Sequence, residues 1–206
     1  MLKDRDTHTN EDLLLDRRTA VPALIGDPSD FLIISGLSGA ARDIGYLTEE
    51  TPNAYLLGGA MGAAASMGLG LALAQPERQV LVVSGDGELL MNVGTLATIG
   101  HMRPHNLTML CIDNGRYGET GNQKSHTHHT VDLAKIAQGS GIEATLTVRS
   151  EAEFAPAARL LRSRNGPSFV VLRVSDGAPV KYNRNFDAVE TKSKFRRALH
   201  ANPEII

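Results

Sequence analysis

Short apolar runs of strand length recur along this chain, and stretches with helical character lie between them. The apolar runs are 31–35, 79–84, 107–113, 144–148 and 168–174. The helical stretches are 60–75, 88–100, 131–139 and 151–164. Alternation of fully apolar strands with helices is typical of a parallel sheet that is covered on both faces. The sequence therefore predicts an α/β fold with a doubly wound, mostly parallel sheet.

Local signals support these boundaries and indicate one domain. Ser150 and Glu153 have the spacing of a capping box, and Gly139 lies where the preceding helix should end. No Ser/Gly/Pro-rich or charged linker divides the chain. We expect a single domain over 1–206 with a core at about 20–175. The tail, 176–206, is expected to end in a short helix that packs on this domain or on a partner.

Composition narrows the class of ligand. A formal net charge of -2 with 4% aromatic residues disfavours nucleic-acid binding, and no apolar run approaches the length of a membrane span. Residues 1–18 lack the apolar segment of a signal peptide, and Cys111 is the single cysteine, so no intrachain disulfide can form. We therefore expect a cytoplasmic protein with a small-molecule ligand, without a nucleic-acid or membrane partner.

The segment SGDG, residues 84–87, joins an apolar run to a helical stretch. Asp86 is thus expected just beyond the carboxyl end of a central strand, where open α/β sheets bind ligands. Gly85 and Gly87 allow a bulky ligand to approach the main chain closely. The N–H groups of the next helix could face an anion, while Asp86 holds a hard cation. An ordinary turn is the alternative interpretation of this segment.

Asn114 provides a second oxygen at the equivalent place. It follows the run 107–113, which is one strand–helix–strand crossover after Asp86, so the two side chains are expected side by side. Mg²⁺ prefers oxygen ligands of these kinds, and the pair predicts a magnesium–diphosphate site. Other phosphate motifs do not fit, because G-x-x-x-x-G-K-[ST] is absent and Gly68 and Gly70 lie inside a helical stretch.

The segments 56–100 and 106–127, which contain GDG and the later asparagine, resemble the cofactor-binding half of thiamine-diphosphate enzymes. They are most similar to the branch of decarboxylases that act on sulfopyruvate and phosphonopyruvate. The resemblance covers roughly residues 20–175. It implies thiamine diphosphate and Mg²⁺ as cofactors.

The resemblance also implies a role for individual residues. Asp86 and Asn114 would be side-chain ligands of the metal, and Arg116 would contribute its main-chain carbonyl. Glu88 replaces a residue that is often small in the family, so we expect its side chain to point away from the diphosphate. The implied cofactor-binding residues are Gly59, Met61, Gly85, Gly87, Glu88, Tyr117, Gly118 and Thr120.

Two-domain members of the family contain a second, pyrimidine-binding domain that supplies an activating glutamate. This chain has room for one domain only, and Glu49 and Glu50 precede a Thr-Pro turn that we expect in solvent. The resemblance therefore implies a pyrimidine-binding alpha subunit that brings this glutamate. It also implies a hetero-oligomer with its active site between the subunits.

Further residues have chemistry that the motif does not use. His126 and His128, in QKSHTHHT, are candidates for a catalytic role because imidazoles transfer protons near neutral pH. A solvated loop and a zinc site stay open as alternatives. Arg42 could bind an anionic substrate group or cap a helix.

The resemblance implies a carboxy-lyase that is active only with its partner subunit and acts on a small anionic 2-oxo acid. The favoured reaction converts 3-sulfopyruvate to sulfoacetaldehyde and CO₂, with 3-phosphonopyruvate as the next candidate substrate. Two alternatives belong to other classes: a subunit of a 2-oxoacid oxidoreductase, and a non-catalytic scaffold that binds the cofactor.

Overall fold

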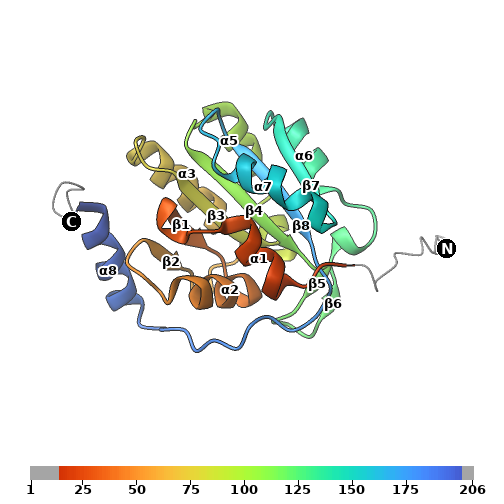
Figure 1. Ribbon diagram of the computed structural model, residues 1–206, viewed down its shortest axis with the longest axis horizontal. Helices are drawn as coiled ribbons and strands as arrows, with labels where there is room; N and C mark the ends of the chain where they lie inside the picture. Colours follow the sequence, from red (N-terminus) through yellow and green to blue (C-terminus); the bar gives the residue numbers. More distant parts are fainter. Residues whose placement is uncertain (1–13, 201–206) are drawn as a thin grey trace.

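A computed structural model describes residues 14–200 and contains one parallel sheet in the order β2-β1-β3-β4-β8-β7 (Figure 1). All neighbouring strands pair in parallel. The strands are β1 (Leu32–Ser35), β2 (Ala54–Leu56), β3 (Val80–Gly85), β4 (Leu107–Asp113), β7 (Ala144–Val148) and β8 (Ser168–Arg173). The predicted doubly wound α/β fold is confirmed.

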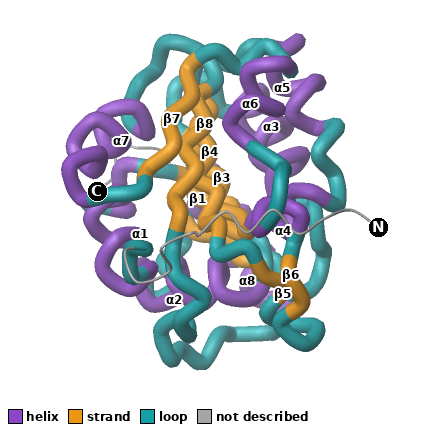
Figure 2. The backbone as a smooth tube through the Cα atoms, turned by 90° about the vertical axis from the view of Figure 1, so that its right-hand side faces the viewer, coloured by secondary structure: helices purple, strands orange, loops and turns teal. Residues whose placement is uncertain are grey.

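Helices cover both faces of this sheet (Figure 2). On one face lie α1 (Arg17–Ile25), α2 (Ser38–Thr48) and α7 (Phe154–Leu161), and on the other α3 (Ala64–Ala74), α5 (Thr95–Met102) and α6 (Leu133–Gly139). Strand side chains alternate between the two layers: Ile33 packs with the first set, and Leu32 and Ile34 pack with the second. Because both faces of the central strands β1, β3, β4 and β8 are buried, these strands are mostly apolar.

The stretch 88–100, which we predict as one helix, forms two. A five-residue helix, α4 (Asp86–Leu90), is followed by a turn and then by α5. Asn92 fixes the turn, because its side-chain amide donates to the Gly62 carbonyl at 3.1 Å and to Ser66 Oγ at 3.2 Å. Because α4 begins at Asp86, this residue is the first of a helix and does not lie in a loop.

Helix α6 ends at Gly139 as predicted, and the capping box of Ser150 and Glu153 is present. The box begins the 3₁₀-helix η4 (Glu151–Glu153), which leads into α7. Another 3₁₀-helix, η2 (Pro28–Asp30), connects α1 to β1. No helix within residues 14–200 combines the length and the apolar character that crossing a bilayer requires.

The tail packs on this domain. After β8 it runs along one edge of the molecule and ends in α8 (Ala188–His200) (Figure 1). The Arg184 guanidinium donates to the Leu57 carbonyl at 2.9 Å, and the Lys194 ammonium donates to the Glu50 carbonyl at 2.6 Å. Phe195 of α8 is buried against the ring of Tyr55, with ring centroids 5.5 Å apart. These contacts fasten the tail along α2 and β2.

The strand order creates a crevice at the carboxyl edge of the sheet. From β1 the chain continues to β2 on one side, whereas β3 is followed by β4 on the other. The connections after β1 and β3 therefore diverge, which is where doubly wound folds bind ligands. A cavity of about 350 Å³ lies at this place.

Two glycines of α3 predict opposite effects of the same substitution. A β-carbon on Gly68 would overlap Val82 Cγ2 in the central strand, whereas one on Gly70 meets no described atom within 4 Å. We expect Gly68→Ala to lower the free energy of unfolding by about 1–3 kcal/mol through overpacking. Gly70→Ala should raise it by up to about 1 kcal/mol, because alanine favours the helix. Urea denaturation measures both, and equal effects would contradict this packing.

Candidate active site

The cavity at the carboxyl edge brings together most of the predicted site residues. Its walls come from the start of α2, the start of α4, the end of β4, the following hairpin and residues 176–179 of the tail. Gly59 is not among the lining residues and lies in an exposed turn before α3. The predicted residues that do line it are Met61, Gly85, Asp86, Gly87, Glu88, Asn114, Arg116, Tyr117, Gly118 and Thr120.

Asp86 and Asn114 lie at neighbouring strand ends. Gly85 is in register with Ile112, so Asp86 and the segment 113–114 come at the same edge of the sheet. Asp86 is 1% exposed. The side-chain oxygen of Asn114 accepts a hydrogen bond from the Arg116 N–H at 3.1 Å. A carboxylate, an amide oxygen and a main-chain carbonyl from one small region are a suitable ligand set for a hard cation.

The glycines of the GDG segment serve different purposes. A β-carbon on Gly87 would overlap the ring of Tyr117, so only glycine lets this ring pack against α4. A β-carbon on Gly85 or Gly118 would instead extend into space with no described atom within 4 Å. Because both residues line the cavity, their missing side chains leave room for a ligand next to Asp86.

Two hydroxyl residues that we did not predict hold Asp86. After β4 the chain forms the hairpin β5 (Arg116–Tyr117) and β6 (Gln123–Lys124) and folds back, with the Ser125 N–H donating to the Gly115 carbonyl at 2.8 Å. The Ser125 hydroxyl donates to Asp86 Oδ2, and Thr127 Oγ1 lies 2.9 Å from the same oxygen. No spacing in the sequence indicates these contacts, because they form only when the loop folds back onto α4.

Asp113 faces this cluster and not the cavity. It is 3% exposed, and its Oδ1 lies 2.7 Å from Thr127 Oγ1. The Arg173 guanidinium pairs with its Oδ2 at 2.5 Å. Burial raises the pKa of Asp86, and the nearby charge of Asp113 raises it further.

Glu88 is buried at the boundary between the cavity and the loop after β1. Its Oε2 accepts a hydrogen bond from the Leu37 N–H at 3.2 Å, and its Oε1 is buried without a partner in the described chain. The carboxylate packs so closely on Gly36 that a β-carbon there would overlap it. Its side chain thus lies against the β1–α2 loop while still lining the cavity. Burial raises the pKa of Glu88 to about 7.

Three arginines line the cavity, and each is paired with a carboxylate. The most buried pair joins Arg17 of α1 to Asp43 of α2. Arg42 lies within α2, so its side chain contributes charge to the cavity wall and does not begin the helix. The pairs are Arg17–Asp43 at 2.6 Å, Arg42–Glu119 at 3.8 Å and Arg116–Asp176 at 3.6 Å.

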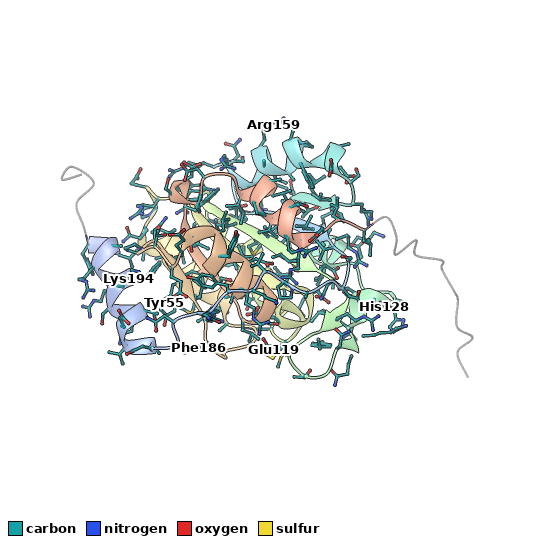
Figure 3. All side chains as sticks on the ribbon, turned by 60° about the horizontal axis from the view of Figure 1, so that its bottom comes forward. Tyr55, Glu119, His128, Arg159, Phe186 and Lys194 are labelled. Carbon is teal, nitrogen blue, oxygen red and sulfur yellow. The ribbon has the colours of Figure 1, made fainter. Side chains whose placement is uncertain are left out.

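The histidines of the same loop lie outside the cavity lining. His126 and His128 belong to the 3₁₀-helix η3 (His126–His128), and His128 lies at the periphery of the molecule (Figure 3). The ring of His128 packs edge-on to that of His129, with centroids 5.0 Å apart. Between residues 14 and 200, no three His, Cys, Asp or Glu side chains are grouped in a way that could hold a metal ion. A catalytic role of His126 or His128 stays a prediction.

The profile of one protein family, described as "Thiamine pyrophosphate enzyme, C-terminal TPP binding domain", matches residues 38–172 of this chain. The matched region begins at the first residue of α2 and ends within β8, so that β1 lies outside it. It includes each of the predicted cofactor and metal residues. The tail, which supplies residues 176–179 of the cavity wall, lies beyond the matched region.

Curated relatives include two proteins named sulfopyruvate decarboxylase subunit beta. The one from Methanocaldococcus jannaschii is 46% identical over 123 residues, covering 60% of this chain and 64% of the relative. The one from Methanococcus maripaludis is 32% identical over 90% of this chain and 98% of the relative. Phosphonopyruvate decarboxylase from Streptomyces viridochromogenes is 36% identical over 79% of this chain, which spans only 40% of that protein.

Solved structures share the fold. The 2-oxoglutarate:ferredoxin oxidoreductase from Magnetococcus marinus superposes with a TM-score of 0.62 at 20% sequence identity. This match covers 88% of the present chain and 65% of the oxidoreductase chain. At that identity the likeness concerns the fold alone.

Glu88 predicts a pH-dependent stability. The pKa of Glu88 is about 7 in the folded chain, against an ordinary value of 4.5. Between pH 4.5 and pH 7 the Glu88 carboxyl is therefore protonated in the folded chain and ionised in the unfolded chain. Stability from this group is therefore lost as pH rises toward 7. Glu88→Gln should stabilise the protein, relative to wild type, by on the order of 2–3 kcal/mol more at about pH 8 than at about pH 5.

Chemical denaturation at both pH values tests this expectation. Glu77→Gln, at an exposed position, is the matched control and should show no such difference. The same wild-type-to-variant difference at both pH values would contradict a buried, titrating Glu88.

Proposed function

The chain belongs to the thiamine pyrophosphate enzymes, whose C-terminal TPP binding domain it contains, and we propose that it is the cofactor-binding subunit of a 2-oxo acid decarboxylase. One observation carries the proposal. Asp86 and Asn114, which directly follow the adjacent strands β3 and β4, both line a cavity at the carboxyl edge of the sheet. If the GDG segment were only an ordinary turn, it would not need a buried carboxylate beside a cavity large enough for a ligand.

The proposed substrate is a small anionic 2-oxo acid. The relatives named above are decarboxylases of sulfopyruvate and of phosphonopyruvate, compounds that both carry a strong anion on C3. The preferred reaction is 3-sulfopyruvate to sulfoacetaldehyde and CO₂, with 3-phosphonopyruvate as the alternative substrate. Arg17 and Arg42 in the cavity wall support an anionic ligand.

The residues present fit magnesium and a diphosphate. Asp86, Asn114 and the carbonyl of Arg116 would hold the metal, and the open space at Gly85 and Gly118 would admit the diphosphate. Gly87 and Glu88 would offer main-chain N–H groups, with Tyr117 to Thr120 on the other side. The Glu88 carboxylate is tied to the Leu37 N–H, which limits its reach toward this anion.

The chain's residues would bind and orient, while the cofactor supplies the electron sink. When bound, thiamine diphosphate provides a cationic ring that accepts the electron pair left as CO₂ departs. Met61 would support the folded cofactor from the cavity wall, and Gly59 would contribute its carbonyl to the pyrimidine. The apolar part of the cavity wall would limit the access of water to the reacting carbon.

We further propose a pyrimidine-binding alpha subunit that supplies the activating glutamate. Neither Glu49 nor Glu50 lines the cavity, and the Glu50 carboxylate instead accepts a hydrogen bond from the tail at Asn185. The name "subunit beta" of two relatives supports a hetero-oligomer. His126 and His128 stay candidates for proton transfer in that assembly.

A 2-oxoacid oxidoreductase subunit is the second candidate, favoured by the shared fold with the Magnetococcus protein. Such enzymes pass electrons to iron–sulfur clusters, which are held by cysteine thiolates. Cys111, the only cysteine of this chain, is fully buried in β4, and burial raises its pKa well above the usual value. A cluster would therefore have to belong to another subunit, and iron in the purified complex would favour this candidate.

Calorimetric titration of thiamine diphosphate with Mg²⁺ tests the proposed function. Wild-type chain should bind the cofactor only when Mg²⁺ is present, and the affinity should rise when the alpha subunit is added. Asp86→Ala should remove Mg²⁺-dependent binding because it deletes a metal ligand. Glu77→Ala, an exposed acid outside the cavity lining, should bind like wild type. Binding by Asp86→Ala at wild-type strength would overturn the proposal.

A further inference from the structure

We propose that Ser125 and Thr127 are positioning residues, which hold the Asp86 carboxylate in the orientation that binds a divalent cation. Arg173 anchors them through Asp113. The inference rests on the proposed function for the identity of the cation. It adds residues that lie behind the ligands and do not touch the metal themselves.

The first argument concerns one oxygen atom. Ser125 and Thr127 both contact Oδ2 of Asp86, Ser125 by donating its hydroxyl and Thr127 at 2.9 Å. The carboxylate of an aspartate can rotate about the bond that joins it to Cβ. Two partners on the same oxygen restrict this rotation and so fix the orientation of the carboxylate group. The other oxygen, Oδ1, lies outside this pair of contacts and is left for a metal. Groups behind a ligand commonly set its orientation in this way.

The second argument concerns Thr127, which contacts both carboxylates. Its Oγ1 lies 2.9 Å from Asp86 Oδ2, 2.7 Å from Asp113 Oδ1 and 2.9 Å from Ser125 Oγ. A hydroxyl has one proton to donate, so its position depends on every one of these neighbours. The Arg173 guanidinium holds Asp113 at 2.5 Å and thereby fixes one side of the group. The side chains consequently act as one unit.

The third argument concerns charge. Asp86, Asp113 and Thr127 are all under 10% exposed, and the Arg173 guanidinium pairs with Asp113. Two buried carboxylates and one guanidinium leave a net negative charge, which is costly away from water. A divalent cation at Asp86 offsets that charge.

The experiment titrates Mg²⁺ into the full chain at a saturating concentration of thiamine diphosphate. Thr127→Val keeps the shape of the side chain and removes the hydroxyl, and Ser125→Ala removes the second hydroxyl. Each should raise the Mg²⁺ concentration for half-maximal binding by about 10–100-fold. Thr127→Ser retains the hydroxyl and should stay within about threefold of wild type. Thr98→Val, at an exposed position in α5, is the matched control.

Two readouts separate positioning from a merely structural role. Thermal unfolding without Mg²⁺ should be similar for Thr127→Ser and wild type. The affinity for thiamine diphosphate at saturating Mg²⁺ should change much less than the affinity for Mg²⁺. If Thr127→Val fails to fold, Ser125→Ala provides the same test.

The outcomes also separate this inference from the proposed function. Wild-type Mg²⁺ affinity in both Thr127→Val and Ser125→Ala, with loss in Asp86→Asn, would overturn the positioning role and leave the proposed function intact. If Thr127→Ser and Thr127→Val weakened Mg²⁺ binding equally, the effect would come from packing and not from the hydroxyl. That result would also overturn the positioning role. Unchanged binding in Asp86→Asn would overturn both.

Discussion

The parallel pairing of β3 with β4 is the interaction on which the site depends. Its register opposes Gly85 and Ile112, so Asp86 and Asn114 emerge at one edge of the sheet although a whole crossover separates them in the chain. The apolar strands hold this register from both faces, since a slip would expose their buried side chains. Core packing and ligand geometry are therefore specified by the same residues.

The cavity wall combines groups that would repel one another without further partners. Asp86 and Glu88 place two buried carboxylates beside a space proposed for an anionic diphosphate, and Asp113 is buried behind Asp86. Arg173 compensates Asp113, and the Leu37 N–H compensates part of Glu88. Asp86 is stabilised by hydroxyls alone among the described side-chain contacts, which is the arrangement expected of a carboxylate that binds a metal. Local charge balance thus supports the proposed ligand set.

Sequence reasoning predicted the parallel sheet except for its short edge strand β2, and it predicted the metal-ligand pair, because both depend on local patterns. It missed α2, where Gly39 and Gly45 weaken the helical signal, although these glycines let Arg17 and Tyr182 pack closely. It also drew attention to His126 and His128, whose chemistry is conspicuous, and overlooked Ser125 and Thr127. The role of these hydroxyls arises only when the hairpin folds back onto α4, a long-range contact that no spacing in the chain reveals.

Crystallography with Mn²⁺ in place of Mg²⁺, together with thiamine diphosphate, would test the central claim most directly. Mn²⁺ shares the preference of Mg²⁺ for oxygen ligands and can be located by its anomalous scattering. The account predicts a single strong peak in contact with Asp86, Asn114 and the Arg116 carbonyl. A peak at the loop of His126 and His128, or cofactor bound without a metal at Asp86, would contradict it.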